Sequence, residues 1–399
     1  MPISFARRIQ QVQPSATLAV DAKAKAMQAQ GIDVVGFGAG EPDFTTPQHI
    51  VQAGIAAMSG GDTHYGAKRG NELKDAIVAK LKRENELDYA AEQVVVSCGA
   101  KHSLYNIVQV LVDEGDEAII PAPYWVSYLE QVRLAGGKPV IIETGEETGF
   151  KISPEQLERA ITPKTRLFFF NSPSNPTGAV YTPDEIRALA QVIEKHNLVT
   201  ISDEIYERLI YGDISPLSLG SLSKKLLEEL VITVNGVSKT YAMTGWRIGY
   251  AAGPKPIMNA AKKLQSHATS DPAAFSQAGA CEALKNLRMS DEAIMHMCEA
   301  FDERRKHMIK RIHELPGVSI LEPLGAFYAF ANVSGVFGRK IGGIEIKSAM
   351  DFTNIALEQA KVAVVPGEAF GSPKHVRLSY ATSVELIDKG LDRLRDLLK

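Results

Sequence analysis

Hydrophobic positions in this chain form short apolar runs that alternate with longer amphipathic stretches, starting near residue 70. Residues 71–85, 102–112 and 183–196 repeat their apolar positions with the period of a helix. The apolar runs between such stretches are short enough to be strands, and they lie at residues 94–97, 118–121, 140–142, 167–170, 199–201 and 231–234. Short, largely apolar strands separated by helices indicate a mostly parallel sheet that helices cover on both faces. We therefore predict an α/β fold.

The pattern changes after about residue 290. We expect Ser290 and Asp291 to cap a long helix that runs to His313, and a final helix to begin at Val384. Shorter strand-like pieces lie between these helices, at residues 326–330, 362–365 and 376–379. This mixture is typical of a smaller α+β domain.

A chain of 399 residues exceeds the size at which one hydrophobic core usually stops growing, so two domains are expected. We predict a large domain at residues 46–290, built on a seven-stranded sheet, and a small domain made of residues 1–45 and 291–399. Ligands of mostly parallel sheets bind at the carboxyl ends of the strands. Polar residues that follow predicted strands are therefore candidate site residues.

The formal charge is −3, from 44 basic and 47 acidic residues, and no long run carries a single sign. This balance argues against nucleic-acid binding and against a membrane-binding surface. Three cysteines without a CxxC spacing predict neither a disulfide framework nor a zinc site, and nine histidines show no metal-ligand spacing. The spacing of these cysteines and histidines leads us to expect no metal. The first residues lack the apolar stretch of a secretory signal, so we expect a cytoplasmic protein.

Lys239 and Arg247 give the strongest chemical signal. Lys239 follows an apolar run, and Arg247 lies eight positions later between Gly245 and Gly249. A lysine in a partly desolvated pocket can lose its charge and form a Schiff base with an aldehyde, and an arginine on a glycine frame suits a bidentate contact with a phosphate. Pyridoxal phosphate carries both groups. The alternative is a pair of solvated surface cations.

Two further strand ends carry polar residues. Asp203 and Tyr206 follow one apolar run, and Asn175 follows another and precedes Pro176. A buried carboxylate needs a cation or a donor, and Asp203 opposite a pyridinium nitrogen would keep that nitrogen protonated. Tyr206 could then reach the phenolic oxygen of the ring. The alternatives are a helix N-cap at Asp203 and an Asx-type turn at Asn175.

Three other positions suit the same kind of site. The turn at Gly99 joins a predicted strand to a helix, where backbone N–H groups can bind a phosphate. Trp125 follows another strand and could either stack on a flat heterocycle or serve only in packing. Arg377 alternates with apolar neighbours, so its side chain is expected to point inward and to need an anion. That anion is a substrate carboxylate or an internal one.

Several motifs occur in one order over nearly the whole chain. They are Ala39-Gly40-Glu41-Pro42-Asp43, Tyr65, Pro123-Tyr124-Trp125, Asn175-Pro176-Thr177-Gly178, Asp203-Glu204-Ile205-Tyr206, Ser238-Lys239, Arg247 and Arg377. Together they resemble the class I aminotransferases of PLP fold type I, specifically the bacterial aspartate aminotransferase branch. The resemblance implies pyridoxal 5'-phosphate as cofactor and a homodimer with shared active sites. It also implies ping-pong transfer from L-aspartate to 2-oxoglutarate, giving oxaloacetate and L-glutamate.

The resemblance also implies a role for each cofactor-binding residue. Lys239 would carry the Schiff base and move the proton, while Asp203 would pair with the ring nitrogen. Tyr206 and Asn175 would bind the ring oxygen, and Trp125 would lie against the ring face. The phosphate would be held by the backbone at Ala100 and Lys101, by Arg247 and, from a partner subunit, by Tyr65. Gly99 and Ser238 would also contact the cofactor.

For the substrate, the resemblance implies that Arg377 binds the α-carboxylate, assisted by Asn175 and Gly40 and beside Trp125. Lys101 would reach the distal carboxylate of aspartate or glutamate, with the hydroxyl groups of Ser15 and Thr17 nearby. Small-molecule dicarboxylic amino acids and 2-oxo acids are therefore favoured over alanine or aromatic substrates.

Three positions depart from the pattern of the family. Ala100 stands where close relatives often have a second glycine, so the phosphate turn must avoid a positive φ there. Gly236 supplies no hydroxyl group where other subgroups use a serine. Gln13 stands where prephenate-active relatives tend to carry a basic residue, which weakens a second activity on prephenate.

Other activities remain open at this stage. Prephenate or broad-specificity amino transfer would use the same scaffold, and a β-lyase or a decarboxylase would share Lys239 and Asp203. A transcription regulator that senses the cofactor would need an N-terminal DNA-binding module. Because the aminotransferase pattern begins by residue 14, we expect no room for such a module.

Overall fold

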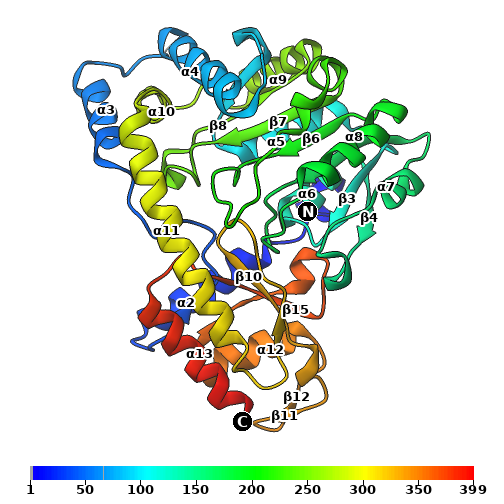
Figure 1. The fold of residues 1–399 in the computed structure, drawn as a ribbon, viewed down its shortest axis with the longest axis vertical. Helices are drawn as coiled ribbons and strands as arrows, with labels where there is room; N and C mark the ends of the chain where they lie inside the picture. Colours follow the sequence, from blue (N-terminus) through cyan, green and yellow to red (C-terminus); the bar gives the residue numbers. More distant parts are fainter. Residues whose placement is uncertain (1–2, 66) are drawn as a thin grey trace.

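The structure is a computed structural model that describes residues 3–65 and 67–399. A seven-stranded sheet forms the centre of the upper part of Figure 1. In spatial order its strands are β2 (Val94–Ser97), β8 (Gly249–Ala252), β7 (Val231–Gly236), β6 (Thr200–Asp203), β5 (Thr165–Asn171), β3 (Glu117–Ala122) and β4 (Lys138–Glu143). Within this sheet only β8 runs antiparallel to its neighbours. The mostly parallel seven-stranded sheet is therefore confirmed.

The sheet is buried on both faces because neighbouring residues of one strand point to opposite sides. Ile120 and Phe169 pack against one layer of helices, whereas Ile119 and Phe168 pack against the other. The first layer consists of α5 (Ala100–Leu111), α6 (Val126–Leu134) and α9 (Lys255–Ala268). The second layer contains α7 (Pro154–Ala160) and α8 (Pro183–His196). A separate group near β2 comprises α3 (Gln48–Ser59), α4 (Ala67–Asn85) and α10 (Ala274–Lys285).

A second, antiparallel sheet forms the lower part of Figure 1. Its strands in spatial order are β14 (Val365–Pro366), β15 (His375–Ser379), β10 (Tyr328–Asn332) and β9 (Ser319–Ile320). The helices of this part are α2 (Ala16–Ala29), α12 (Ala349–Ile355) and α13 (Val384–Leu398). The smaller elements are α1 (Arg7–Gln10), the hairpin of β11 (Lys340–Ile341) and β12 (Ile344–Glu345), and the parallel pair of β1 (Val35–Gly36) and β13 (Val362–Ala363). This last pair joins the N-terminal segment to the smaller part.

The long helix α11 (Leu287–Ile312) runs beside both parts of the molecule (Figure 1). It begins at Leu287, so the expected cap at Ser290 and Asp291 is wrong. Ser290 lies inside the helix, where its hydroxyl group donates to the Ala283 carbonyl at 2.8 Å. That carbonyl belongs to the last turn of α10, which leaves its final carbonyls without partners inside the helix. The predicted division of the chain at residue 291 falls within α11 and stays a prediction.

Two strands show where the apolar pattern was a weak guide. Strand β8 was not predicted, because its sequence of one glycine, one tyrosine and two alanines lacks the β-branched residues typical of strands. Strand β10 begins at Tyr328 rather than at Ala326, since Ala326 has a left-handed φ of 58° that a strand cannot contain.

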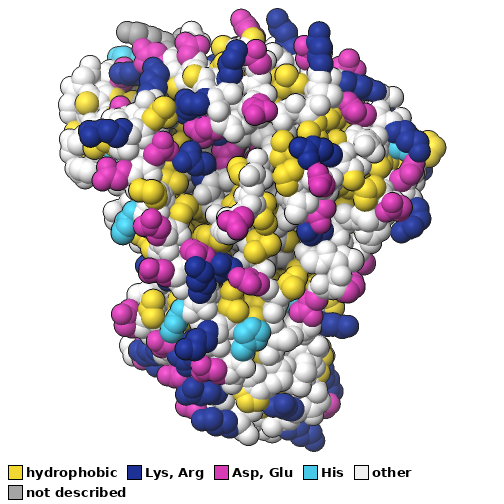
Figure 2. All heavy atoms as spheres, in the orientation of Figure 1, with side chains coloured by type: hydrophobic (Ala, Val, Ile, Leu, Met, Phe, Trp, Pro, Cys, Tyr) yellow, Lys and Arg dark blue, Asp and Glu magenta, His cyan; other side chains and the backbone are white. Residues whose placement is uncertain are grey.

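The surface carries charges of both signs. Figure 2 shows basic and acidic side chains interspersed over the face drawn, in line with 44 basic and 47 acidic residues in the chain. In the part of the chain that the structure describes, none of the helices has the length and the apolar character that crossing a membrane demands.

Candidate active site

The candidate residues gather at the carboxyl edge of the seven-stranded sheet. Strands β5 and β6 end side by side, with Asn171 opposite Asp203. Lys239 follows the end of β7, and the chain then returns along the antiparallel strand β8. Because the return starts at the same edge, Arg247 lies at the same end of the sheet as Lys239. The topology therefore brings together groups that belong to separate strands.

Lys239 lies half-buried between this edge and the segment around Gly40. Its Nζ donates to the Gly40 carbonyl at 2.5 Å and lies 5.9 Å from the centroid of the Tyr206 ring. Desolvation lowers the pKa of Lys239 to about 8, and neighbouring cations act in the same direction while Glu41 opposes them. The alternative of a freely solvated lysine is therefore wrong, and Lys239 can serve as a neutral amine near neutral pH.

Asp203 is buried at the end of β6. Its Oδ2 accepts a hydrogen bond from the Tyr128 hydroxyl group at 2.6 Å, and its Oδ1 accepts one from the Ile205 N–H at 3.3 Å. Burial raises the pKa of Asp203 to about 6, although both donors and Lys239 favour the ionised form. The segment after Asp203 is a turn and not a helix, so the carboxylate supports that turn and is not a helix N-cap.

Tyr206 lies in the same turn, with its ring buried. Its hydroxyl group is 2.9 Å from the hydroxyl group of Tyr328 on β10. Burial, together with Tyr328, holds the pKa of Tyr206 well above its usual range. The phenol therefore stays protonated and can donate a hydrogen bond to an anionic oxygen.

Arg377 lies on β15 with 2% of its surface exposed. It donates from Nη1 to the Asn175 Oδ1 at 2.9 Å and from Nη2 to the Gly38 carbonyl at 3.0 Å, while its buried Nε has no partner. Its guanidinium lies 4.4 Å from the centroid of the Tyr328 ring. No carboxylate of the described residues contacts it, so the alternative of an internal salt bridge is wrong. A buried guanidinium in this setting requires an anion from outside the chain.

Asn175 presents its side chain to Arg377 and does not close a local turn. That turn is held by Asn171, whose Oδ1 accepts the Asn175 N–H at 3.2 Å and whose Nδ2 donates to the Asp203 carbonyl at 2.9 Å. Asn171 thus links the ends of β5 and β6 and leaves the Asn175 amide free to face the site.

The turn before α5 lets other groups approach its backbone closely. Gly99 takes a φ of 86° at the N-cap position, and Ala100 is the first residue of the helix, so the positive φ falls on the glycine as expected. A Cβ on Gly99 would lie only 2.3 Å from the Arg247 Nη2, which shows how closely the guanidinium covers the turn. The first N–H groups of α5 and the Arg247 cation together suit a phosphate.

The glycine at position 236 is explained by the packing of β7 against β8. A Cβ on Gly236 would lie 2.9 Å from the Ile248 carbonyl oxygen and 3.0 Å from the Gly249 Cα. A serine would not fit without a shift of backbone, so the chain supplies no hydroxyl group here. Ser238, two residues further on, is buried beside Lys239.

A hollow of about 670 Å³ opens beside Arg247 and Lys101, and Ser15 and Gln13 form part of its wall. The Lys101 Nζ lies 4.9 Å from the centroid of the half-buried Trp125 ring. Burial lowers the pKa of Lys101, and Arg247 acts in the same direction. The Ser15 hydroxyl group, which caps α2, is 2.8 Å from that of Thr17.

One predicted site residue lies apart from the others. Tyr65 is 94% exposed in the loop after α3. Its expected role, which requires a partner subunit, stays a prediction.

The site as a whole is strongly cationic. Lys101, Arg247 and Arg377 all lie near enough to Lys239 for their positive charges to lower its pKa. Lys239, Arg247 and Arg377 donate to carbonyl oxygens or to an amide, and no carboxylate of the described residues forms a salt bridge with any of the four cations. Cations that form no internal salt bridge favour anionic ligands.

Comparison with known proteins identifies the family. The family model for aminotransferase class I and II matches residues 32–394. The chain is a member of this family. An aspartate aminotransferase of Bacillus subtilis (strain 168) is 49% identical over 394 residues, which is 98% of each chain. An aspartate/prephenate aminotransferase of Nitrosomonas europaea is 44% identical over 400 residues, covering 99% of this chain and 100% of the relative.

The fold of this aminotransferase agrees with that identification. The crystal structure of an aspartate aminotransferase from Rhizobium meliloti has a TM-score of 0.95 to it at 41% sequence identity. The match covers 100% of this chain and 99% of that one. The resemblance to class I aminotransferases of the bacterial aspartate aminotransferase branch is confirmed.

Sequence reasoning missed two residues of the aminotransferase site. Tyr128 donates to Asp203, and its place in the aromatic segment that follows β3, three residues after Trp125, was an available signal. Tyr328 contacts both Tyr206 and Arg377. It comes from the smaller sheet, and its own segment shows only the alternation of a strand, so no local pattern pointed to it.

Proposed function

We propose that this aminotransferase uses pyridoxal 5'-phosphate to transfer the amino group of L-aspartate to 2-oxoglutarate, forming oxaloacetate and L-glutamate. The observation that carries the proposal is the set of four cations, Lys101, Lys239, Arg247 and Arg377, that form no salt bridge with a carboxylate of the described residues. The cofactor brings a phosphate, and both substrates bring two carboxylates, so these ligands supply the anions that the cations lack. The high identity to relatives named aspartate aminotransferases supports the same conclusion.

The residues present fit the cofactor. The Gly99 turn and Arg247 suit its phosphate, the Asp203 carboxylate suits its ring nitrogen, and the Lys239 amine suits its aldehyde. When bound, the cofactor supplies an aldehyde for the amino group and an electron sink for the carbanion at the substrate Cα.

The remaining residues would position the substrate. Arg377, oriented by Asn175, would bind the α-carboxylate, and Lys101 would reach the distal carboxylate. Lys239 Nζ would take the proton from the Cα and return it, because a pKa of about 8 suits proton transfer near neutral pH. Trp125 would limit the access of water to the reacting atoms.

We further propose a cytoplasmic homodimer. Ile55 and Met58 of α3 are 50% and 54% exposed, and the nearby Tyr65 is 94% exposed. A second copy packed on this surface would bury these apolar side chains and could bring Tyr65 to the phosphate of the other subunit.

A half-reaction tests the function. Purified enzyme is mixed with L-aspartate in the absence of a 2-oxo acid, and the absorbance of the cofactor is followed. We expect stoichiometric conversion of the cofactor from its aldehyde form to its amine form, with oxaloacetate released. Release of ammonia or CO₂ with the aldehyde form retained would instead indicate a lyase or a decarboxylase, and the proposal would be wrong.

Prephenate is a second candidate acceptor. The hollow beside Lys101 is also lined by Tyr105 and Leu129, which would suit the apolar part of a larger substrate. The Nitrosomonas europaea relative is named for both substrates. Repeating the half-reaction with arogenate, the amino product of prephenate, ranks this activity against aspartate. We expect aspartate to react faster, because Gln13 brings no positive charge to the hollow.

A further inference from the structure

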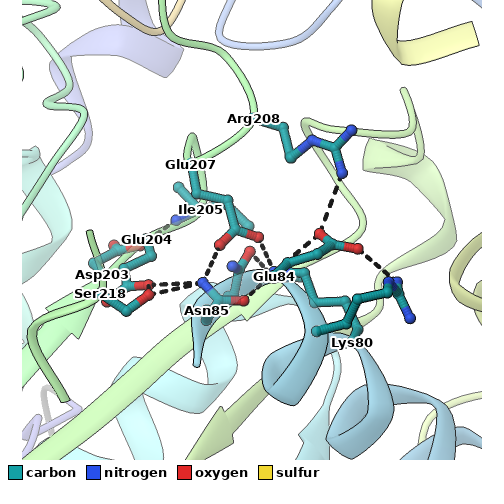
Figure 3. Close-up of polar contacts among 12 residues, drawn as sticks. Lys80, Glu84, Asn85, Asp203, Glu204, Ile205, Glu207, Arg208 and Ser218 are labelled. Atoms are coloured by element: carbon teal, nitrogen blue, oxygen red, sulfur yellow. Dashed lines mark hydrogen bonds and ion pairs between the residues drawn. The ribbon is translucent and has the colours of Figure 1, made fainter. Parts of the chain in front are cut away.

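Residues 203–207 form a turn that faces in two directions. Asp203 and Tyr206 point toward the candidate active site, where tyrosine hydroxyl groups meet them. Glu204 and Glu207 point away from it, toward the C-terminal end of α4 (Figure 3). The active-site residues therefore have a second set of contacts behind them, which the proposed reaction does not use.

Glu204 is held at both carboxylate oxygens. Its Oε1 accepts the Ser202 hydroxyl group at 2.8 Å, and its Oε2 accepts the Ser218 hydroxyl group at 2.6 Å. The Asn85 amide lies 3.4 Å from the same Oε2. With only 5% of Glu204 exposed, these contacts lie in a water-poor interior, where hydrogen bonds are stronger than in water.

Glu207 is tied to α4 by charge. Its Oε2 accepts the Asn85 amide at 2.6 Å, and its Oε1 forms an ion pair with Lys80, whose side chain is 3% exposed. Lys80 also donates to the Asn85 Oδ1 at 2.7 Å. Glu84 of α4, 3.7 Å from Lys80, pairs with Arg208 at 3.2 Å.

The front of the turn is packed, because Ile205 and Tyr206 belong to a buried core, whereas its back adjoins a hollow. A cavity of about 110 Å³ lies against it, and its wall includes Asn85, Glu204, Glu207 and Ser218. Since the hollow leaves this side without close packing, the polar contacts of Glu204 and Glu207 hold the back of the turn. Burial, followed by the charge of Glu207, raises the pKa of Glu204 to about 7, while Ser218, Ser202 and Lys80 act against this rise. The buried Tyr89 lies close enough for its pKa to respond to the same carboxylate.

We propose that Glu204 is a positioning residue for Asp203 and Tyr206. By fixing the back of the turn, Glu204 fixes the orientation in which these two side chains meet the cofactor ring. The proposal therefore rests on the proposed function. Without Glu204 the turn relaxes into the cavity, and Asp203 and Tyr206 rotate out of register with their ligand. A misplacement of this kind weakens binding and changes the environment of the ring, and it does not merely lower the stability of the fold.

The test compares Glu204→Ala with Glu204→Gln in purified protein reconstituted with pyridoxal 5'-phosphate. The measurements are the cofactor dissociation constant and the pH midpoint of the absorbance of the bound cofactor. Glu204→Ala should bind the cofactor about ten-fold or more weakly and shift the midpoint by about one pH unit. Glu204→Gln should restore both values, because a neutral amide can still pair with Ser202 and Ser218 after their hydroxyl groups rotate.

Glu117 provides the matched control. Its carboxylate is 7% exposed and accepts the Thr162 hydroxyl group at 2.6 Å. Because Glu117 is the first residue of β3, it lies at the amino ends of the parallel strands, away from the candidate active site. Glu117→Ala should lower the melting temperature and leave both cofactor measurements at wild-type values. If Glu204→Ala behaves in the same way, the positioning role is refuted. If wild-type protein does not bind the cofactor, the proposed function itself is refuted.

Ser218→Ala covers the case in which Glu204→Ala does not fold. It removes one of the contacts at the Glu204 Oε2 and keeps the carboxylate. We expect a smaller loss of cofactor affinity in the same direction, with a smaller shift of the absorbance midpoint. Wild-type values for both in a folded Ser218→Ala protein would count against the proposal.

Discussion

At the scale of single residues, the charge of Asp203 depends on a balance between burial and two donors. Burial favours the neutral acid, whereas the Tyr128 hydroxyl group and the Ile205 N–H favour the carboxylate. The resulting pKa of about 6 leaves Asp203 mostly ionised at pH 7. A pyridinium nitrogen needs that ionised form, so the hydrogen bond from Tyr128 bears directly on cofactor binding.

Tyr128→Phe tests this balance. Hydrogen bonds to charged groups contribute about 1.5–3 kcal/mol, so removing the donor should raise the pKa of Asp203 further above its usual range. Because the carboxylate is then lost at a higher pH as the solution is acidified, the acid limb of kcat should move to higher pH. We also expect about ten-fold weaker cofactor binding at pH 7.

The control for that variant is Tyr181→Phe. Tyr181 is also buried and accepts the Ile152 N–H at 2.9 Å, but it packs with Phe170 and α8, outside the candidate site. Loss of the Tyr181 hydroxyl group should lower the free energy of unfolding and leave the acid limb of kcat unchanged. An equal shift of the acid limb in both variants would show that Tyr128 acts only through the stability of the fold.

At the scale of elements, the paired strands β7 and β8 determine which residue can occupy position 236. Gly236→Ser should place its Cβ against the Ile248 carbonyl and the Gly249 Cα. Overpacking of this kind costs about 1–3 kcal/mol, which urea unfolding can measure. Gly245→Ser is the matched control in the following loop, because a Cβ there has no neighbour within 4 Å. Equal stability of the two variants would contradict the packing argument.

How well the sequence predicted an element depended on whether its signal was local. Helix α8 was predicted at its observed bounds from its apolar period, and in the structure Thr182 and Glu185 form a capping box at its start, with Pro183 after the cap. The start of α11 was placed too late because the nearby α10 partners Ser290, a contact that no local pattern shows. Tyr328 was missed for the same reason, since its role depends on a contact between two sheets.

At the scale of the whole molecule, the candidate site draws on both sheets. Lys239 and Asp203 come from the seven-stranded sheet, and Arg377 and Tyr328 come from the smaller one. A further contact joins these parts, from the Thr244 hydroxyl group to Glu41 at 2.7 Å. Any movement between the sheets would therefore change substrate binding more than cofactor binding.

The proposed dimer predicts complementation between two defective chains. Lys239→Ala should abolish turnover, and Tyr65→Ala should weaken binding of the cofactor phosphate in the other subunit. When the two variants are unfolded and refolded together, one site of each mixed dimer would contain both Lys239 and Tyr65. We expect the mixture to recover up to about one quarter of wild-type activity, since half the dimers are mixed and each holds one intact site. Activity no greater than that of the separate variants would refute shared sites.

The reversed strand β8 has a consequence for how such an enzyme can diversify. The groups suited to the aldehyde and the phosphate, Lys239 and Arg247, lie on one continuous loop, so their separation is set by the length of that loop. Arg377 and Lys101, which are suited to the substrate carboxylates, lie on other elements. Two residues suited to the cofactor thus lie on one loop, apart from the two residues suited to the substrate carboxylates, while α5 serves both through its first N–H groups and Lys101. A descendant could acquire a new amino-acid substrate through changes on α5 or β15 while inheriting the loop intact.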